Sequence, residues 1–267
     1  LDVGMAHAFV DAGSVQLVDL EQDPYRITSH RADDDLEEQP SYHRPSAGRP
    51  TPRVDVYRRF VMLVDVSEED FYVVDVFRLR GGIEHHLAIH GPPGRASVSG
   101  VQLEKQSGGT LGDPTGHYGK PYVDDLGESA LDPFSMITNV SRGLLDGPAS
   151  ITYSTGEEPS AGVRFIALPE QGTLLEVGDG RPPANPKQYK LKMAYLSRKG
   201  DESLSNVFVL RTEENRLSSQ FVTVIEPRGA KSVITSAQRL KVKTDAECEV
   251  QNAKCKMQSA KCPLRWR

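Results

Sequence analysis

The densest block of strand-forming residues in the chain is Tyr57–Gly91, YRRFVMLVDVSEEDFYVVDVFRLRGGIEHHLAIHG. β-Branched and aromatic residues dominate Val61–Val66 and Phe71–Leu79, as is typical of strands. The four polar residues between these two runs predict a hairpin loop, and Gly81-Gly82 predicts a second turn into Ile83–His90. We therefore expect three consecutive antiparallel strands.

The register of the first hairpin can be predicted from its loop. Pairing Val66 with Phe71 would place Asp75 opposite Met62, because side chains alternate along a strand. Both faces of the strand pair are then rich in apolar residues, whereas a solvated antiparallel pair has one polar face. We expect other parts of the protein to cover both faces.

Continuing this register through the double-glycine turn brings His86 and His90 diagonal to Asp75. These residue types bind metals, so a small metal-dependent enzyme built on the three is one hypothesis. The two histidines are four strand residues apart, roughly 13 Å at ~3.3 Å per residue, which is too far for both to reach one zinc ion easily. We favour a structural polar cluster without metal, in which imidazole or arginine partners satisfy the carboxylate.

A second candidate region is the glycine-rich stretch 107–133, SGGTLGDPTGHYGKPYVDDLGESALDP. A loop of this length inside a compact domain is usually functional or disordered. We predict a carbohydrate-binding role, with Tyr118 and Tyr122 stacking on sugar rings and His117 and Lys120 binding carboxylates. The alternative is that the tyrosines only pin the loop to a sheet.

The remaining sequence predicts an all-β fold, a large antiparallel β-sandwich of about a dozen short strands with little helix, because short strand-forming runs alternate with glycine and proline turns. Residues 1–56 are expected to form an edge strand at Val15–Leu20 and a long surface loop, and residues 57–244 the sandwich domain. After the central block the expected strands are 96–103, 151–154, 163–168, 173–177, 189–196, 206–210, 220–225 and 232–242.

The basic tail, residues 245–267, is expected to be weakly ordered. It holds all three cysteines, Cys248, Cys255 and Cys262. No C-x-x-C pair and no nearby histidine indicates a zinc site there, and the redox state of the three thiols stays open.

Composition excludes several classes of function. The 267 residues include 32 Lys and Arg against 37 Asp and Glu, a net charge of −5 that provides no general attraction for nucleic acid. No apolar run approaches the length of a membrane span. None of the common nucleotide-binding, serine-hydrolase or zinc-protease motifs is present, so no catalytic residue is predicted.

The central block also resembles a known family. Three of its segments, Tyr57–Arg59, Tyr72–Arg78 and Gly81-Gly82 with His85–Gly91, resemble the C-terminal β domain of heparinase II/III-like polysaccharide lyases. A later segment, Ser218–Pro227, is similar to a strand near the end of that domain. The resemblance spans about residues 10–242.

The resemblance implies a bacterial-type enzyme, periplasmic or secreted, that cleaves uronic-acid-containing polysaccharides by β-elimination. In this family an N-terminal helical toroid packs on a large β-sandwich, and the substrate lies between the two parts. A tyrosine or histidine abstracts the proton next to the carboxyl group, and some members hold zinc in the β domain through histidine and aspartate.

From the resemblance we expect the chain to be the β-sandwich portion of such a lyase, which positions acidic polysaccharide and supports a toroid absent from this chain. We expect no activity from the chain alone. No catalytic or metal-binding residue and no cofactor is carried over, because the family's catalytic and zinc motifs find no match here. The alternative is a stand-alone carbohydrate-binding module that uses Tyr118 and Tyr122.

Overall fold

The fold consists of antiparallel sheets, as predicted. The computed structural model describes residues 4–22, 54–81, 84–92, 94–119, 122–123, 129–130, 133–155, 161–180, 191–199, 217–228 and 232–240. The chain divides into two units after residue 237, and the description below concerns the first. Its described residues form two antiparallel sheets of eight and five strands and contain no α-helix, which confirms the all-β sandwich.

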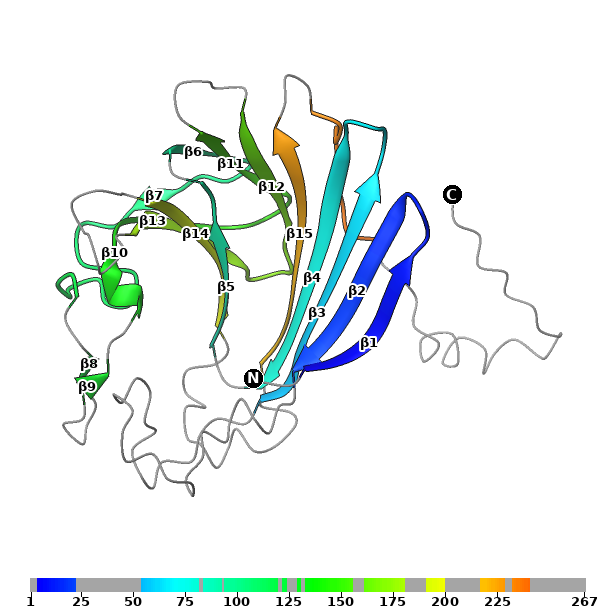
Figure 1. The fold of residues 1–267 in the computed structure, drawn as a ribbon. Helices are drawn as coiled ribbons and strands as arrows, with labels where there is room; N and C mark the ends of the chain where they lie inside the picture. The colour runs from blue at the N-terminus through cyan, green and yellow to red at the C-terminus, as the bar shows by residue number, and fades with distance from the viewer. Residues whose placement is uncertain are drawn as a thin grey trace, which may run out of the picture. The chain divides into compact units, whose positions relative to one another are not determined.

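The larger sheet has the strand order β1-β2-β3-β4-β15-β12-β11-β6 (Figure 1). Its strands are β1 (Gly4–Asp11), β2 (Val15–Gln22), β3 (Val54–Asp65), β4 (Phe71–Gly81), β6 (Gly94–Ser99), β11 (Ala149–Thr155), β12 (Gly162–Leu168) and β15 (Ser218–Arg228).

The smaller sheet has the order β5-β14-β13-β10-β7. Its strands are β5 (Glu84–His90), β7 (Glu104–Lys105), β10 (Ile137–Leu144), β13 (Leu174–Gly180) and β14 (Leu191–Lys199). A short ribbon of β8 (Tyr122–Val123) and β9 (Ser129–Ala130) and a 3₁₀ helix, η1 (Pro133–Met136), lie between β7 and β10 in sequence.

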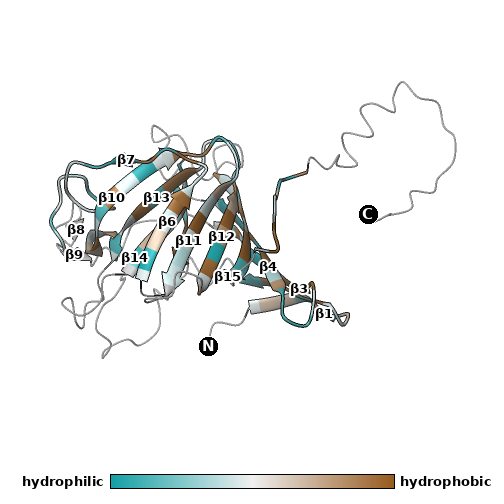
Figure 2. Ribbon diagram, turned by 90° about the horizontal axis from the view of Figure 1, so that it is seen from above, coloured by the Kyte–Doolittle hydropathy of each residue, from teal (hydrophilic) through white to brown (hydrophobic). Residues whose placement is uncertain are grey.

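The main hydrophobic core lies between the two sheets. Ile151 and Tyr153 of β11 are buried there, and the Tyr153 hydroxyl donates a hydrogen bond to the Ile89 carbonyl at 3.1 Å. Figure 2 shows hydrophobic and hydrophilic residues interleaved along strands such as β12, as expected when one strand face packs on a core. The larger sheet contributes Phe77, Leu79, Ile151, Tyr153 and Phe221, and the smaller sheet contributes Leu87, Ile89, Leu175, Ala194 and Leu196.

The predicted register of the first hairpin is wrong by one residue. Asp65 pairs with Phe71, so Asp75 lies opposite Val61 and not Met62. The cause is the turn: the Val66 amide donates to the Asp70 carbonyl at 2.8 Å, and the Ser67 hydroxyl accepts the Asp70 amide at 3.0 Å. A one-residue shift moves every side chain of a strand to the other face.

The expected third strand does not pair with the hairpin. β5 crosses to the smaller sheet, where Ala88 lies opposite Tyr195 of β14. The position beside β4 is taken instead by β15, with Thr223 opposite Asp75. Because β15 lies more than a hundred residues after β4, the sequence of the central block gives no indication of this pairing.

The ends of the larger sheet also differ from the prediction. The strand expected at the sheet edge, β2, is internal, because β1 lies outside it. The strand expected at Ser232–Val242 is absent from the described residues 232–240; Ile234 and Ala237 instead pack on the outer face of β12 and β15. The expected strand 206–210, the long loop after β2 and the cysteine tail lie outside the described residues.

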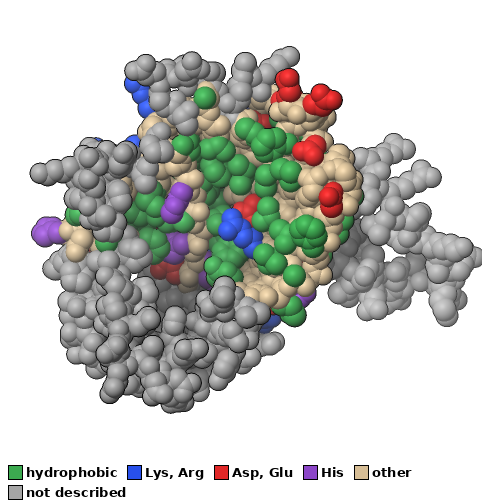
Figure 3. Space-filling model, viewed as in Figure 1, with side chains coloured by type: hydrophobic (Ala, Val, Ile, Leu, Met, Phe, Trp, Pro, Cys, Tyr) green, Lys and Arg blue, Asp and Glu red, His purple; other side chains and the backbone are tan. Residues whose placement is uncertain are grey.

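The strands β1 to β3 extend past the smaller sheet and keep apolar side chains on their inner face. Phe9 is 80% exposed and Leu20 45% exposed among the described residues. Figure 3 shows hydrophobic side chains gathered over this part of the larger sheet, with basic and acidic groups among them. The sequence predicted that other parts of the protein cover both faces of these strands. Among the described residues, no such layer covers their inner face.

His85 lies where the chain crosses between the sheets. The ring is buried, with Nδ1 2.8 Å from the Ser219 hydroxyl and Nε2 2.5 Å from the Gly81 carbonyl. Burial lowers the pKa of His85 below its usual 6.5. The hydrogen bond to the Gly81 carbonyl opposes this shift, and Arg198 of β14 and His86 of β5 add to it. The folded protein therefore favours the neutral ring.

Stability is expected to depend on the protonation of His85. Because its pKa is lower in the folded than in the unfolded chain, the unfolded chain binds more protons below about pH 6.5, and the free energy of unfolding falls as pH decreases from there. In His85→Gln this contribution to the pH dependence of the free energy of unfolding should be absent. Urea unfolding at several pH values between 5 and 8 measures it. Equal pH dependence in the two proteins would contradict the assignment.

Candidate functional site

The outer face of the smaller sheet carries the polar side chains of interest. Leu87 and Ile89 of β5 point into the core, so His86 and His90 point away from it. A second hydrophobic cluster covers part of this face, formed by Leu111, Phe134, Ile137, Val140, Met193 and Tyr195. The loop after β7 and η1 supply the covering residues.

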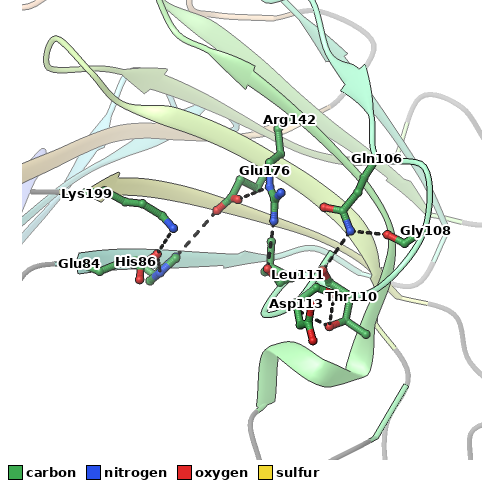
Figure 4. A network of polar contacts seen from close by, with 10 residues as sticks. All are labelled: Glu84, His86, Gln106, Gly108, Thr110, Leu111, Asp113, Arg142, Glu176 and Lys199. Atoms are coloured by element: carbon green, nitrogen blue, oxygen red, sulfur yellow. Dashed lines mark hydrogen bonds and ion pairs between the residues drawn. The ribbon is translucent and has the colours of Figure 1, made fainter. Parts of the chain in front are cut away.

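A network of acidic, basic and histidine side chains crosses this face (Figure 4). The Lys199 ammonium lies 3.2 Å from the Glu84 carboxylate, which lies 2.9 Å from His86 Nε2. Further along, Arg142 donates through Nε to Glu176 Oε1 at 2.7 Å. β5, β14, β13 and β10 each contribute one or two of these groups, so sheet pairing sets their spacing.

Two buried atoms at the centre of this network face each other. His86 Nδ1 and Glu176 Oε2 are 3.9 Å apart, and neither has a hydrogen-bond partner among the described residues. The Glu176 side chain is 5% exposed and that of His86 19%. The Phe134 ring packs on His86 with 4.7 Å between ring centroids.

Two groups on this face have shifted pKa values. The hydrogen bond with His86, helped by Lys199, lowers the pKa of Glu84 to about 2. Burial and the nearby Glu176 raise the pKa of Tyr195 to about 12. Glu84 is therefore a permanent anion at neutral pH, and the Tyr195 phenol stays protonated and is unsuited to act as a base.

The predicted carbohydrate-binding loop begins on this same face. Arg142 Nη2 donates to the Leu111 carbonyl at 3.0 Å, and the Gly119 amide donates to the Ser135 carbonyl at 3.1 Å. Between these anchors His117 and Tyr118 are exposed, Tyr118 by 40%. The structure describes only the backbone of Tyr122, in β8, and Lys120 lies outside the described residues.

The structure does not bring Asp75, His86 and His90 together. Asp75 is buried on the inner face of the larger sheet and accepts two hydrogen bonds from Arg59, at 2.9 and 2.8 Å. Both histidines lie on the outer face of the smaller sheet, because β5 pairs with β14 there and not with the hairpin of β3 and β4. The predicted polar cluster is therefore wrong in its histidines, although an arginine does satisfy the carboxylate.

The metal hypothesis loses its geometric basis with this separation. The part of the chain that the structure describes contains no group of three or more histidine, cysteine, aspartate or glutamate side chains that could hold a metal ion.

Sequence reasoning missed Glu176, Arg142 and Tyr195. A signal was present for the first of these, since Glu176 interrupts the apolar run Leu174–Val177. A charge in such a run is buried with a partner when the strand is internal. The partner itself, 34 residues away on β10, could not be read from spacing.

Comparisons with known proteins add no assignment. No protein-family model matches the chain, and no curated protein matches it in sequence. Among the described residues no helix is long and apolar enough to cross a membrane. The fold and the network define an antiparallel β-sandwich with a polar site on the outer face of its smaller sheet.

Proposed function

We propose that this chain is the β-sandwich portion of a heparinase II/III-like polysaccharide lyase and that it positions uronic-acid-containing chains for a helical toroid domain. The resemblance of the central block to that family supports the proposal, as does the sandwich architecture. In this proposal the chain binds substrate and contributes no base for proton abstraction.

The observation that carries the proposal is the exposed pair His117–Tyr118 on a loop anchored beside the charged network. Tyrosine presents an apolar ring with a polar end, which suits a sugar ring with its hydroxyl groups. Arg142 and Lys199 are 33% and 48% exposed and supply positive charge for carboxylates. The loop and the network together suit an acidic saccharide.

The first test measures binding and turnover by the chain alone. We expect a uronic-acid oligosaccharide to bind in calorimetric titration, and Tyr118→Ala to weaken it about tenfold, ~1.4 kcal/mol. We expect no rise in absorbance from unsaturated products when the chain is incubated with acidic polysaccharides.

Phe71→Ala is the matched control, because Phe71 is also 40% exposed but lies at the hairpin end of β4. It should leave affinity unchanged. Turnover by the chain alone would contradict a purely positioning role, and failure to bind any acidic oligosaccharide would contradict the proposal as a whole.

The exposure of Tyr118 also favours a second function, a stand-alone carbohydrate-binding module. The two functions differ in the effect on a lyase. If the chain is part of such an enzyme, adding it to a separately produced toroid domain of a heparinase II/III-like lyase should raise turnover. A stand-alone module would bind the polysaccharide and leave that turnover unchanged.

A further inference from the structure

β1 is the strand at one end of the larger sheet, and one of its two edges is open (Figure 1). Among the described residues it pairs only with β2, so no strand pairs with the backbone N–H and C=O groups along its other edge. Such an edge is a template for a further strand. Natural proteins usually protect it with charged side chains, proline or a very short strand.

β1 has little of this protection. Its sequence, GMAHAFVD, contains no lysine, arginine or proline, and the apolar side chains of Met5, Phe9 and Val10 are exposed. The other strands at sheet ends differ. β6 carries Arg95 and two serines, β7 has only two residues, and β5 holds a glutamate and three histidines. β1 is therefore the end strand best suited to pair with another strand.

Strand pairing defines the face on which each side chain of β1 lies. Side chains directly opposite each other in neighbouring strands lie on the same face of a sheet. Following the pairs through β2 and β3 to the core residue Phe77 of β4 places Ala6 and Phe9 on the inner face. Met5 and Val10 are adjacent to these two residues and lie on the outer face, because side chains alternate along a strand.

A bulge interrupts this alternation between Ala6 and Ala8. His7 is the extra residue, and its Nε2 lies 2.5 Å from the carboxylate of Glu21, which is opposite Met5 on the outer face. His7 and Ala8 therefore share the outer face. With this change of phase, only one antiparallel register of β1 against a second β1 places every residue opposite a residue of the same face. That register is centred between His7 and Ala8.

The same register brings large side chains opposite small ones. Phe9 of each copy lies opposite Ala6 of the other on the inner face, and Met5 lies opposite Val10 on the outer face. The one carboxylate of the strand lies opposite a glycine, so no like charges meet. Two-fold symmetry makes each of these pairs twice, as in an isologous interface. The strand is therefore complementary to itself.

We propose that β1 pairs with β1 of a second copy of this chain, in antiparallel orientation, and so joins the two larger sheets into one. The two-fold axis passes between His7 and Ala8. The pairing covers Phe9, the most exposed large hydrophobic side chain that the structure describes. It does not depend on the proposed function, because β1 belongs to the larger sheet and the polar site lies on the smaller one.

The first test is sedimentation equilibrium of the full chain at micromolar concentrations, where we expect a monomer–dimer equilibrium. Phe9→Lys puts a charge on the open edge and should weaken the dimer by at least about tenfold. Leu144→Lys is the matched control, because Leu144 is also exposed but lies on β10 of the smaller sheet. It should leave the dimer unchanged. Circular dichroism checks that both variants are folded.

The second test determines the register by disulfide cross-linking. The native cysteines are first replaced, by Cys248→Ser, Cys255→Ser and Cys262→Ser. A mixture of Met5→Cys and Val10→Cys chains, or of Ala6→Cys and Phe9→Cys chains, should then form cross-linked dimers on mild oxidation. These are adjacent pairs of the register, so one of them is a close pair without hydrogen bonds. A mixture of Met5→Cys and Phe9→Cys should not cross-link, because the two positions lie on opposite faces.

Each outcome decides for or against the pairing. A chain that stays monomeric overturns it, and so does a dimer that Phe9→Lys leaves intact, because that dimer forms through another surface. Equal cross-linking of the matched and mismatched mixtures overturns the register. If the chain is monomeric but binds a separately produced toroid domain, and Phe9→Lys abolishes that binding, the edge belongs to the toroid and the second copy is wrong.

Discussion

Replacing Glu226 by alanine is expected to destabilise the protein by about 3–5 kcal/mol, because it removes one partner of a buried ion pair. The Glu226 side chain is 2% exposed and lies 2.6 Å from Arg164 Nη2. It also accepts the Ser232 hydroxyl at 2.7 Å and the Ile234 amide at 3.1 Å. Its loss would leave a guanidinium without its charge partner and release the segment that covers the outer face of β12 and β15.

Urea unfolding followed by circular dichroism measures this effect, as a midpoint lowered by on the order of 1–2 M. Glu104→Ala is the control, since Glu104 is exposed on β7 and its removal should change the free energy of unfolding by less than about 0.5 kcal/mol. The double variant Arg164→Met with Glu226→Leu should recover most of the loss, because a buried ion pair can be replaced by apolar groups. A loss below about 1 kcal/mol in Glu226→Ala would show that the pair contributes little.

The sequence predicts the strands well where apolar and polar residues alternate without interruption, and poorly where the backbone departs from that pattern. β10 was not predicted. It contains Asn139 with a φ of 53° and a register shift between Thr138 and Ser141, so its pattern changes phase within eight residues. The segment after β15 shows the opposite error, because a strand was predicted there and none is found in the described residues 232–240. It is rich in β-branched residues, but Glu226 binds the Ile234 amide that a sheet ladder would have used.

The site depends on pairings that no local pattern contains. The prediction put His86 beside Asp75 because it assumed that neighbouring strands in sequence are neighbours in the sheet. β15 occupies that position, and β5 pairs with β14, more than a hundred residues later. Glu176 and Arg142 meet His86 only through the order of the smaller sheet. What could be predicted was the exposed loop with His117 and Tyr118, because glycine-rich composition is a local property.

Gly91→Ala is the second substitution with a large expected effect, about 3 kcal/mol of lost stability, at the upper end of the typical range for overpacking. A Cβ atom at Gly91 would lie 2.0 Å from Cγ of Tyr153, well inside contact distance. The Tyr153 ring is 1% exposed, packs edge-on against Phe165 and is held by the hydrogen bond to Ile89, so it has little room to move. Overpacking of this kind forces side chains out of their rotamers or shifts the backbone, which typically costs 1–3 kcal/mol.

Gly147→Ala provides the control for this clash, because a Cβ there would meet no atom within 4 Å. It should be neutral or slightly stabilising, through the smaller conformational entropy of the unfolded chain. Combining Gly91→Ala with Tyr153→Leu tests the assignment directly, since residues in contact give non-additive effects. If the ring of Tyr153 is the obstacle, the double variant loses less stability than the sum of the two single variants, and strict additivity in urea unfolding would place the strain elsewhere in the core.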